Sequence, residues 1–127
     1  MADVTYVVDG GLDILTNRII SAGTEPKFVA WGTGGAAALT TDTGLQTAAA
    51  EARTSGTSSR ALTSTANDTY QVVGTIACTG AGKTITEVAL YDALTVGNCF
   101  LHGSFTGIAL NVGDSIAFTI KSQFNQA

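Results

Sequence analysis

Apolar runs separated by turn-like breaks dominate the last third of the chain. The runs cover residues 85–91, 99–105 and 115–124, and the breaks between them are rich in Gly, Asn and Asp, which are typical turn residues. In the last run, large side chains alternate with small or polar ones. A period of two places the large side chains on one face of a strand. The pattern therefore predicts an antiparallel meander with one buried face.

The chain begins with a short extended segment, residues 1–9, in which Val4, Tyr6 and Val8 share one side. Apolar ends of a β domain can add to a neighbour's sheet, and an aromatic side chain suits such a contact. We therefore interpret residues 1–9 as an N-terminal arm. We expect its three apolar residues, together with Phe124 near the other terminus, to contact a partner.

Two short segments have a helical pattern. Leu12, Leu15 and Ile19 recur at helical spacing and predict a helix over residues 12–22, whose apolar stripe needs a sheet to lie on. A second short helical segment is expected over residues 45–53, after a possible capping sequence rich in Thr and Asp.

The middle of the chain adds further strands and one loop. Strands are expected over residues 27–31 and 69–79, the second interrupted by Gly74 at a bulge. The polar stretch 54–60 is expected to be an exposed loop. The whole chain, residues 1–127, is short enough for one domain with one core. The predicted fold is mainly β: an antiparallel β-sandwich, with a jelly roll as one option, and one short N-terminal helix.

Charged residues make up only 13% of the chain, against about 25% in an average soluble protein. A surface of hydroxyls and small side chains suits a protein that packs against neighbours. The formal net charge of -4 and the lack of any Lys or Arg run argue against a nucleic-acid partner.

The cysteines and the apolar runs bear on the compartment. Cys78 and Cys99 each lie in an apolar run, which indicates two buried reduced thiols. The N-terminus lacks the basic start of a secretory signal. No apolar run approaches the roughly 20 residues that span a bilayer. We therefore expect synthesis in the cytoplasm and no membrane partner.

Residues 77–84, ACTGAGKT, match a loose form of the nucleotide-binding loop. A genuine loop of this kind needs a strand before it and a helix after it, within alternating β and α units. Residues 85–91 fit a helix poorly, so a hairpin turn with a solvated Lys83 is the preferred interpretation. Residues 32–35, GTGG, are likewise interpreted as a surface loop.

The remaining polar residues predict no catalytic, metal or cofactor site. His102 is the only histidine and has no acidic neighbour in sequence, so we expect a solvated histidine or one at the edge of the core. Its spacing from the cysteines is not that of a metal site. Asp42, Asp92 and Asp114 lie at turns or caps, where carboxylates bind backbone amides.

Two stretches together resemble small virion proteins of tailed bacteriophages. The first is residues 29–53, VAWGTGGAAALTTDTGLQTAAAEAR, and the second is residues 85–93, ITEVALYDA, followed by residues 110–120, LNVGDSIAFTI. Similar arrangements recur in head-decoration and tail-fibre proteins, which are mainly β-structured. The resemblance implies a non-enzymatic structural protein without catalytic residues.

Three functions remain open on this basis. Because the chain has no room for a fibre shaft or receptor-binding tip, we expect a head decoration or cement protein. Such a protein would form a homo-oligomer, bind the major capsid protein and lie on the capsid surface after synthesis in the host cytoplasm. The first alternative is a tail or fibre-attachment protein. An alternative of another class is a glycan-binding β module, which would expose two or three aromatic side chains, with Trp31 the first to examine.

Overall fold

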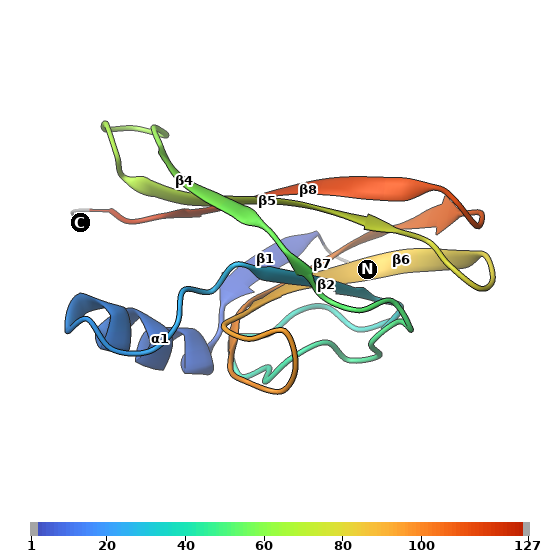
Figure 1. Ribbon diagram of the computed structural model, residues 1–127, viewed down its shortest axis with the longest axis horizontal. Helices are drawn as coiled ribbons and strands as arrows, with labels where there is room; N and C mark the ends of the chain where they lie inside the picture. Colours follow the sequence, from blue (N-terminus) through green and yellow to red (C-terminus); the bar gives the residue numbers. More distant parts are fainter. Residues whose placement is uncertain (1–2, 126–127) are drawn as a thin grey trace.

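The computed structural model describes residues 3–125, which form two antiparallel sheets, one helix and a long irregular segment (Figure 1). A large sheet has the strand order β1-β7-β6-β2-β3, and a small sheet has the order β4-β5-β8. The predicted mainly β sandwich with one short helix is confirmed. The elements are β1 (Val4–Val7), α1 (Asp9–Ile19), β2 (Phe28–Gly32), β3 (Thr54–Ser55), β4 (Thr57–Ala61), β5 (Thr69–Ala77), β6 (Lys83–Tyr91), β7 (Cys99–Leu110) and β8 (Ser115–Gln123).

The three C-terminal strands exist as predicted, but they do not form one meander. β6 and β7 pair in the large sheet, whereas β8 crosses to the small sheet and pairs with β5 along its whole length. β7 also continues five residues beyond the predicted end at 105, to Leu110. The crossing places the apolar face of β8 opposite the large sheet, and so each sheet buries the apolar face of the other.

The main core lies between the two sheets. Trp31 of β2 is 1% exposed and packs edge to face against Phe118 of β8, with the ring centroids 6.4 Å apart. Val72 of β5 and Leu90 of β6 are completely buried in the same cluster. Alternating apolar residues on paired strands supply this core, as the sequence pattern requires.

Glycines at two points let the sheets approach each other. The stretch 54–60, expected to be a loop, is instead the two short strands β3 and β4 with Gly56 between them. A Cβ at Gly56 would lie 2.6 Å from Val72 Cγ1. The bulge expected at Gly74 is absent, since Gly74 pairs regularly with Phe118. A Cβ there would lie 2.8 Å from Val29 Cγ2, so Gly74 serves close packing of the two sheets.

Helix α1 starts three residues earlier than predicted and presents a different face. Ile14 is 3% exposed, whereas Leu12 and Ile19 are 60% and 82% exposed. The reason is Gly11, where a Cβ would lie 2.4 Å from the backbone oxygen of Phe100. The helix packs on β7 through this glycine and Ile14, one turn later, which turns Leu12 and Ile19 of the predicted stripe toward solvent and leaves Leu15 partly buried against the core. Within residues 3–125, no helix is long and apolar enough to cross a membrane.

The other face of the large sheet is covered by residues 33–53, which we call the loop segment. Figure 1 shows this segment, in cyan and green, on the side of the large sheet opposite the small sheet. The helix predicted over residues 45–53 is wrong. The segment makes one isolated β-bridge, between Gly32 and Ala48, and otherwise has no repeating hydrogen-bond pattern.

Candidate functional site

A buried cluster of three ionisable side chains joins the loop segment to the large sheet. His102 of β7 is completely buried between two carboxylates. Its Nδ1 lies 2.6 Å from Asp42 Oδ2 and its Nε2 lies 2.8 Å from Glu87 Oε1. The expectation of a solvated histidine or one at the edge of the core is therefore wrong: Asp42 comes from the loop segment and Glu87 from the neighbouring strand β6, and both face a buried ring. We call these residues the buried triad.

Glu87 is the centre of the buried triad and is 1% exposed. Besides His102, its carboxylate accepts hydrogen bonds from the backbone amides of Gly34, Gln46 and Thr47, at 2.8, 2.8 and 2.9 Å. An ionised carboxylate can accept about four hydrogen bonds, so this one is satisfied. The adjacent amide of Leu45 donates to the Tyr91 hydroxyl at 3.0 Å. These amides are thus committed to side chains of β6, which explains why no helix forms here.

The glycines of the GTGG motif allow the backbone to reach the carboxylate. A Cβ at Gly32 or at Gly34 would lie 2.6 Å from Glu87 Oε2, which is too close for any side chain. The interpretation of this motif as a surface loop holds only in part, because Thr33 and Gly35 are exposed whereas Gly32 and Gly34 are buried. Gly32 and Gly34 serve close approach of the backbone to an anion, and the anion is the protein's own Glu87.

Both carboxylates of the buried triad are held in the ionised form. Burial raises the pKa of Glu87, but the amides of Thr47 and Gln46, His102 and the amide of Gly34 together outweigh it and leave the pKa below its usual value. For Asp42 burial again raises the pKa, and the Leu39 amide and His102 outweigh it. Ionised carboxylates only accept hydrogen bonds, and each ring nitrogen of His102 faces one of these carboxylates.

This arrangement suits a structural role better than a catalytic one. The imidazole is completely buried, and both of its nitrogens are used. A general base needs a free nitrogen within reach of a substrate proton. What the buried triad can do is fix the position of the loop segment on the large sheet.

A second ionic contact holds the far end of the loop segment. Glu51 accepts hydrogen bonds from the indole of Trp31 at 2.8 Å and from the amide of Thr79 at 2.9 Å, and it forms an ion pair with Lys83. Burial raises the pKa of Glu51, but Lys83, Thr79 and Trp31 outweigh it and lower the pKa to about 2. The expectation of a solvated Lys83 is wrong, because its side chain is only 16% exposed.

The segment 77–84 is not a nucleotide loop. It is followed by the strand β6 rather than by a helix, so the phosphate-binding geometry does not arise. It is not a hairpin either, since β5 and β6 belong to different sheets. Cys78 and Cys99 are buried and free, as predicted. Within residues 3–125, no group of three or more His, Cys, Asp and Glu side chains could hold a metal ion.

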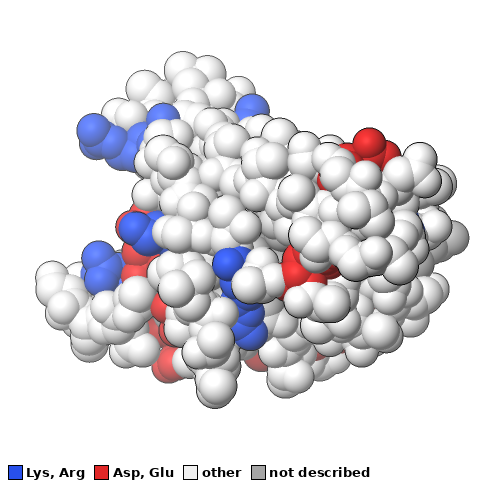
Figure 2. Space-filling model, turned by 45° about the vertical axis from the view of Figure 1, so that its right-hand side comes forward, with Lys and Arg blue, Asp and Glu red and all other residues white. Residues whose placement is uncertain are grey.

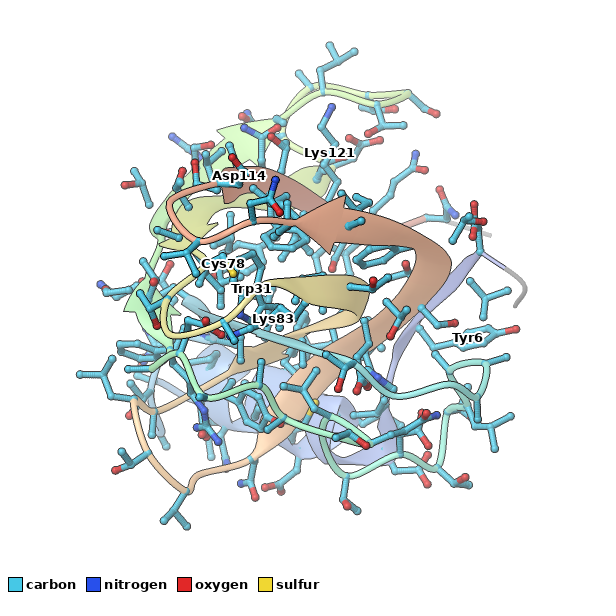
Figure 3. All side chains as sticks on the ribbon, turned by 90° about the vertical axis from the view of Figure 1, so that its right-hand side faces the viewer. Tyr6, Trp31, Cys78, Lys83, Asp114 and Lys121 are labelled. Carbon is cyan, nitrogen blue, oxygen red and sulfur yellow. The ribbon has the colours of Figure 1, made fainter. Side chains whose placement is uncertain are left out.

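The predicted partner-contact residues lie in three different environments. Val4 and Tyr6 belong to β1, which pairs with β7 of the same chain; Tyr6 is 41% exposed and points outward at this edge (Figure 3). Val8 is 1% exposed and packs in a small core cluster, so it offers almost no surface to a neighbour. Phe124 is 46% exposed, just beyond β8. Residues 1–2 of the predicted arm lie outside the described residues, and Val4–Val7 of the arm form a strand of the large sheet.

The aromatic residues do not gather as the glycan-binding alternative requires. Trp31 is 1% exposed, and its indole nitrogen is used by Glu51. Among the described residues, the aromatic side chains that are more than 40% exposed are Tyr6 and Phe124. They lie on different strands or strand ends of different sheets.

Comparison with known proteins identifies the family. The family model described as podophage GP4 fiber I protein gp80 matches residues 12–123. No curated protein and no solved structure matches the chain. The match begins within α1 and runs to the end of β8, and so includes the buried triad, the loop segment and every strand of the two sheets except β1. This protein is therefore a phage virion structural protein that belongs to the podophage GP4 fiber I protein gp80 family.

Proposed function

We propose that the protein is a non-enzymatic structural component of the phage tail fibre or of its attachment to the tail. The observation that carries this proposal is the family match over residues 12–123, because the description of the family names a fibre protein. It favours the tail or fibre alternative over the head decoration or cement protein that the sequence led us to expect.

The surface of the molecule supports a role in an assembly. Figure 2 shows a face that is mostly free of Lys, Arg, Asp and Glu. Such a surface can be covered by a neighbour with little loss of charge hydration. The outer edges of β1 and β8 also leave strand backbone open to pairing. The partners on this proposal are further copies of the chain and other tail proteins, rather than the major capsid protein.

A structural role also agrees with the chemistry of the buried triad. His102 and Glu87 are buried, the Asp42 side chain is 18% exposed, and the three side chains have hydrogen bonds within the protein. A rigid, fully bonded cluster stabilises one shape of the loop segment, which is what a building block of a particle needs.

The location can be tested on purified phage particles. Heads and tails are separated after mild disruption, and each fraction is examined with an antibody against this chain and by mass spectrometry. The proposal expects the protein in the tail fraction, with gold label at the fibres or at their point of attachment. Label spread over the head, with the protein in the head fraction, would instead support the decoration function.

A further inference from the structure

The loop between β6 and β7 carries two aliphatic side chains in an unusual position. Val96 is 84% exposed, more than any other exposed large apolar side chain of the described residues, and Leu94 beside it is 54% exposed. Val96 also has a φ of 57°, in the left-handed region that β-branched residues rarely adopt. We call residues 94–96 the loop tip.

The loop tip is held rigidly from below. The Arg53 guanidinium donates hydrogen bonds to the backbone oxygens of Ala93 and Val96 at 2.8 and 2.7 Å, and it lies 3.5 Å from the centre of the Tyr91 ring. Asp92 accepts a hydrogen bond from the Asn98 amide at 2.7 Å and closes the base of the loop. The charged groups of the loop therefore face inward, and the side chains that face outward are apolar.

Within residues 3–125, no contact covers the exposed Val96 side chain, which is 84% exposed. Asn or Gly at position 96 would adopt the same φ with little strain. Valine adds strain and also exposes an apolar side chain to water. Burial of the loop tip by another surface would offset the unfavourable free energy of the strained backbone and the exposed side chain. Binding would also need little further ordering, because the backbone already has the shape that presents these side chains.

A complementary concave surface lies elsewhere on the same molecule. The end groove has a volume of about 370 Å³ and lies between α1 and the end of the small sheet. Its apolar walls come from Ile14, Leu15, Pro26, Tyr70, Phe100 and Phe124. In Figure 1 this end is at the left, between the helix and the C-terminus, and Figure 2 shows the outline hollowed between these two parts.

The charged groups that line the end groove are already engaged. Arg18 donates a hydrogen bond to the backbone oxygen of Gly23 at 3.0 Å, and Glu25 accepts one from the Tyr70 hydroxyl at 3.2 Å. An uncharged aliphatic occupant therefore needs no new ionic partner. The volume is at the lower end of the about 300–1,000 Å³ that is usual for ligand pockets, a size suited to a few aliphatic side chains.

We propose that the loop tip of one copy, Leu94 and Val96, binds in the end groove of a second copy. The two surfaces share no residues, so the contact is heterologous: each copy gives a loop tip to one neighbour and receives one from another. Such contacts close into a ring or continue as a filament. This proposal holds whether the protein is a fibre component or a head component.

Three variants test the proposal by sedimentation and light scattering. Val96→Asn removes the apolar side chain and fits the left-handed φ. It should raise the melting temperature of the monomer while weakening self-association at least about tenfold, since burying one aliphatic side chain is worth at least that factor. Phe124→Ser alters the receiving surface at a half-exposed position and should weaken association similarly. Val112→Asn, at an exposed apolar residue outside both surfaces, should change neither property.

Mixing the variants gives the sharpest result. Val96→Asn keeps an intact groove and Phe124→Ser keeps an intact loop tip, so a mixture should form heterodimers with one intact contact although each variant alone associates only weakly. The proposal is overturned if the native chain stays monomeric at high concentration, if Val96→Asn associates like the native chain, or if the mixture forms no heterodimer.

Discussion

The large sheet is covered on its two faces by material of opposite kinds. On one face the small sheet contributes strands whose apolar residues alternate and whose amides bond within a regular ladder. On the other face the loop segment has little regular structure, and its amides bond to side chains of the sheet. A sheet face can thus be covered in two ways. The small sheet packs on it through apolar area, whereas the loop segment is held by a buried carboxylate that accepts backbone hydrogen bonds.

Each way satisfies a different physical requirement. Buried backbone amides need partners, and the small sheet supplies them from neighbouring strands. The irregular loop segment cannot do so, and Glu87 takes three of its amides instead. A buried carboxylate is itself unfavourable unless its hydrogen bonds are complete. The loop segment and Glu87 therefore depend on each other.

The largest loss of stability is expected when the apolar packing between the two sheets is disrupted. Phe118→Ala removes a ring that packs on Trp31 and Phe105, and deletions of this kind cost about 3–5 kcal/mol. Denaturant unfolding should show this loss in the free energy of unfolding, in one transition. Val73→Ala, on the outer face of the same sheet, should cost less than about 1 kcal/mol. A similarly small loss for Phe118→Ala would show that the small sheet contributes little.

Disruption of the contact between Glu87 and the loop segment should reduce the free energy of unfolding by a smaller amount. Glu87→Gln keeps the shape but replaces one acceptor oxygen with an NH₂ group that faces other donors. We expect a loss of about 2–3 kcal/mol in the free energy of unfolding, as for a buried partner left unsatisfied. Glu25→Gln is the matched control, because Glu25 accepts a hydrogen bond from Tyr70 but holds no loop. Equal effects of the two substitutions would argue against a special role of Glu87.

The second ionic contact should contribute less again. Lys83→Ala breaks the ion pair with Glu51, whose side chain is 5% exposed, and should cost about 1–2 kcal/mol, between the values for surface and buried pairs. Lys121→Ala removes an exposed lysine of β8 and should stay within about 0.5 kcal/mol. Urea unfolding of both variants measures the difference. If they behave alike, Lys83 is as weakly coupled as a solvated lysine.

Acid should weaken the contacts that Glu51 and Glu87 make with the loop segment, whereas at neutral pH their contribution to stability is complete. The folded pKa of Glu51 is about 2, below its ordinary value of 4.5, and the pKa of Glu87 is also lowered. The stability from these groups is complete above their unfolded pKa and is lost as pH falls through the folded pKa. The free energy of unfolding should therefore fall as pH drops from 4.5 toward 2, less steeply in Glu51→Gln. An unchanged slope in that variant would contradict this assignment.

The same contrast explains what the sequence could predict. Strands β5 and β8 of the small sheet were predictable because their apolar residues repeat at the strand period, a local signal, whereas the polar strand β4 was not. The crossing of β8 to the other sheet was not, because a period of two does not name the partner strand. α1 was placed within three residues, but its buried face was missed because Gly11, which has no side chain, makes the contact.

The buried triad could not be assembled from spacing, since Asp42, Glu87 and His102 come from three distant segments. A weaker signal was present. Glu87 and His102 each interrupt an apolar strand, and an ionisable residue at such a position needs a buried partner of opposite charge. Pairing these two would have found half of the site. The amides of the loop segment leave no mark in the sequence except the glycines that allow their approach.

Hydrogen exchange of the native chain and of Glu87→Gln tests most directly whether a buried charge holds the loop segment. The amides of Gly34, Gln46 and Thr47 donate to Glu87 and should be protected in the native chain. In the variant they should exchange at nearly unprotected rates, while the amides of β5 and β8 keep protection reduced only by the global loss of stability. If those three amides stay as protected as the amides of β5 and β8, the loop segment is held by something other than Glu87.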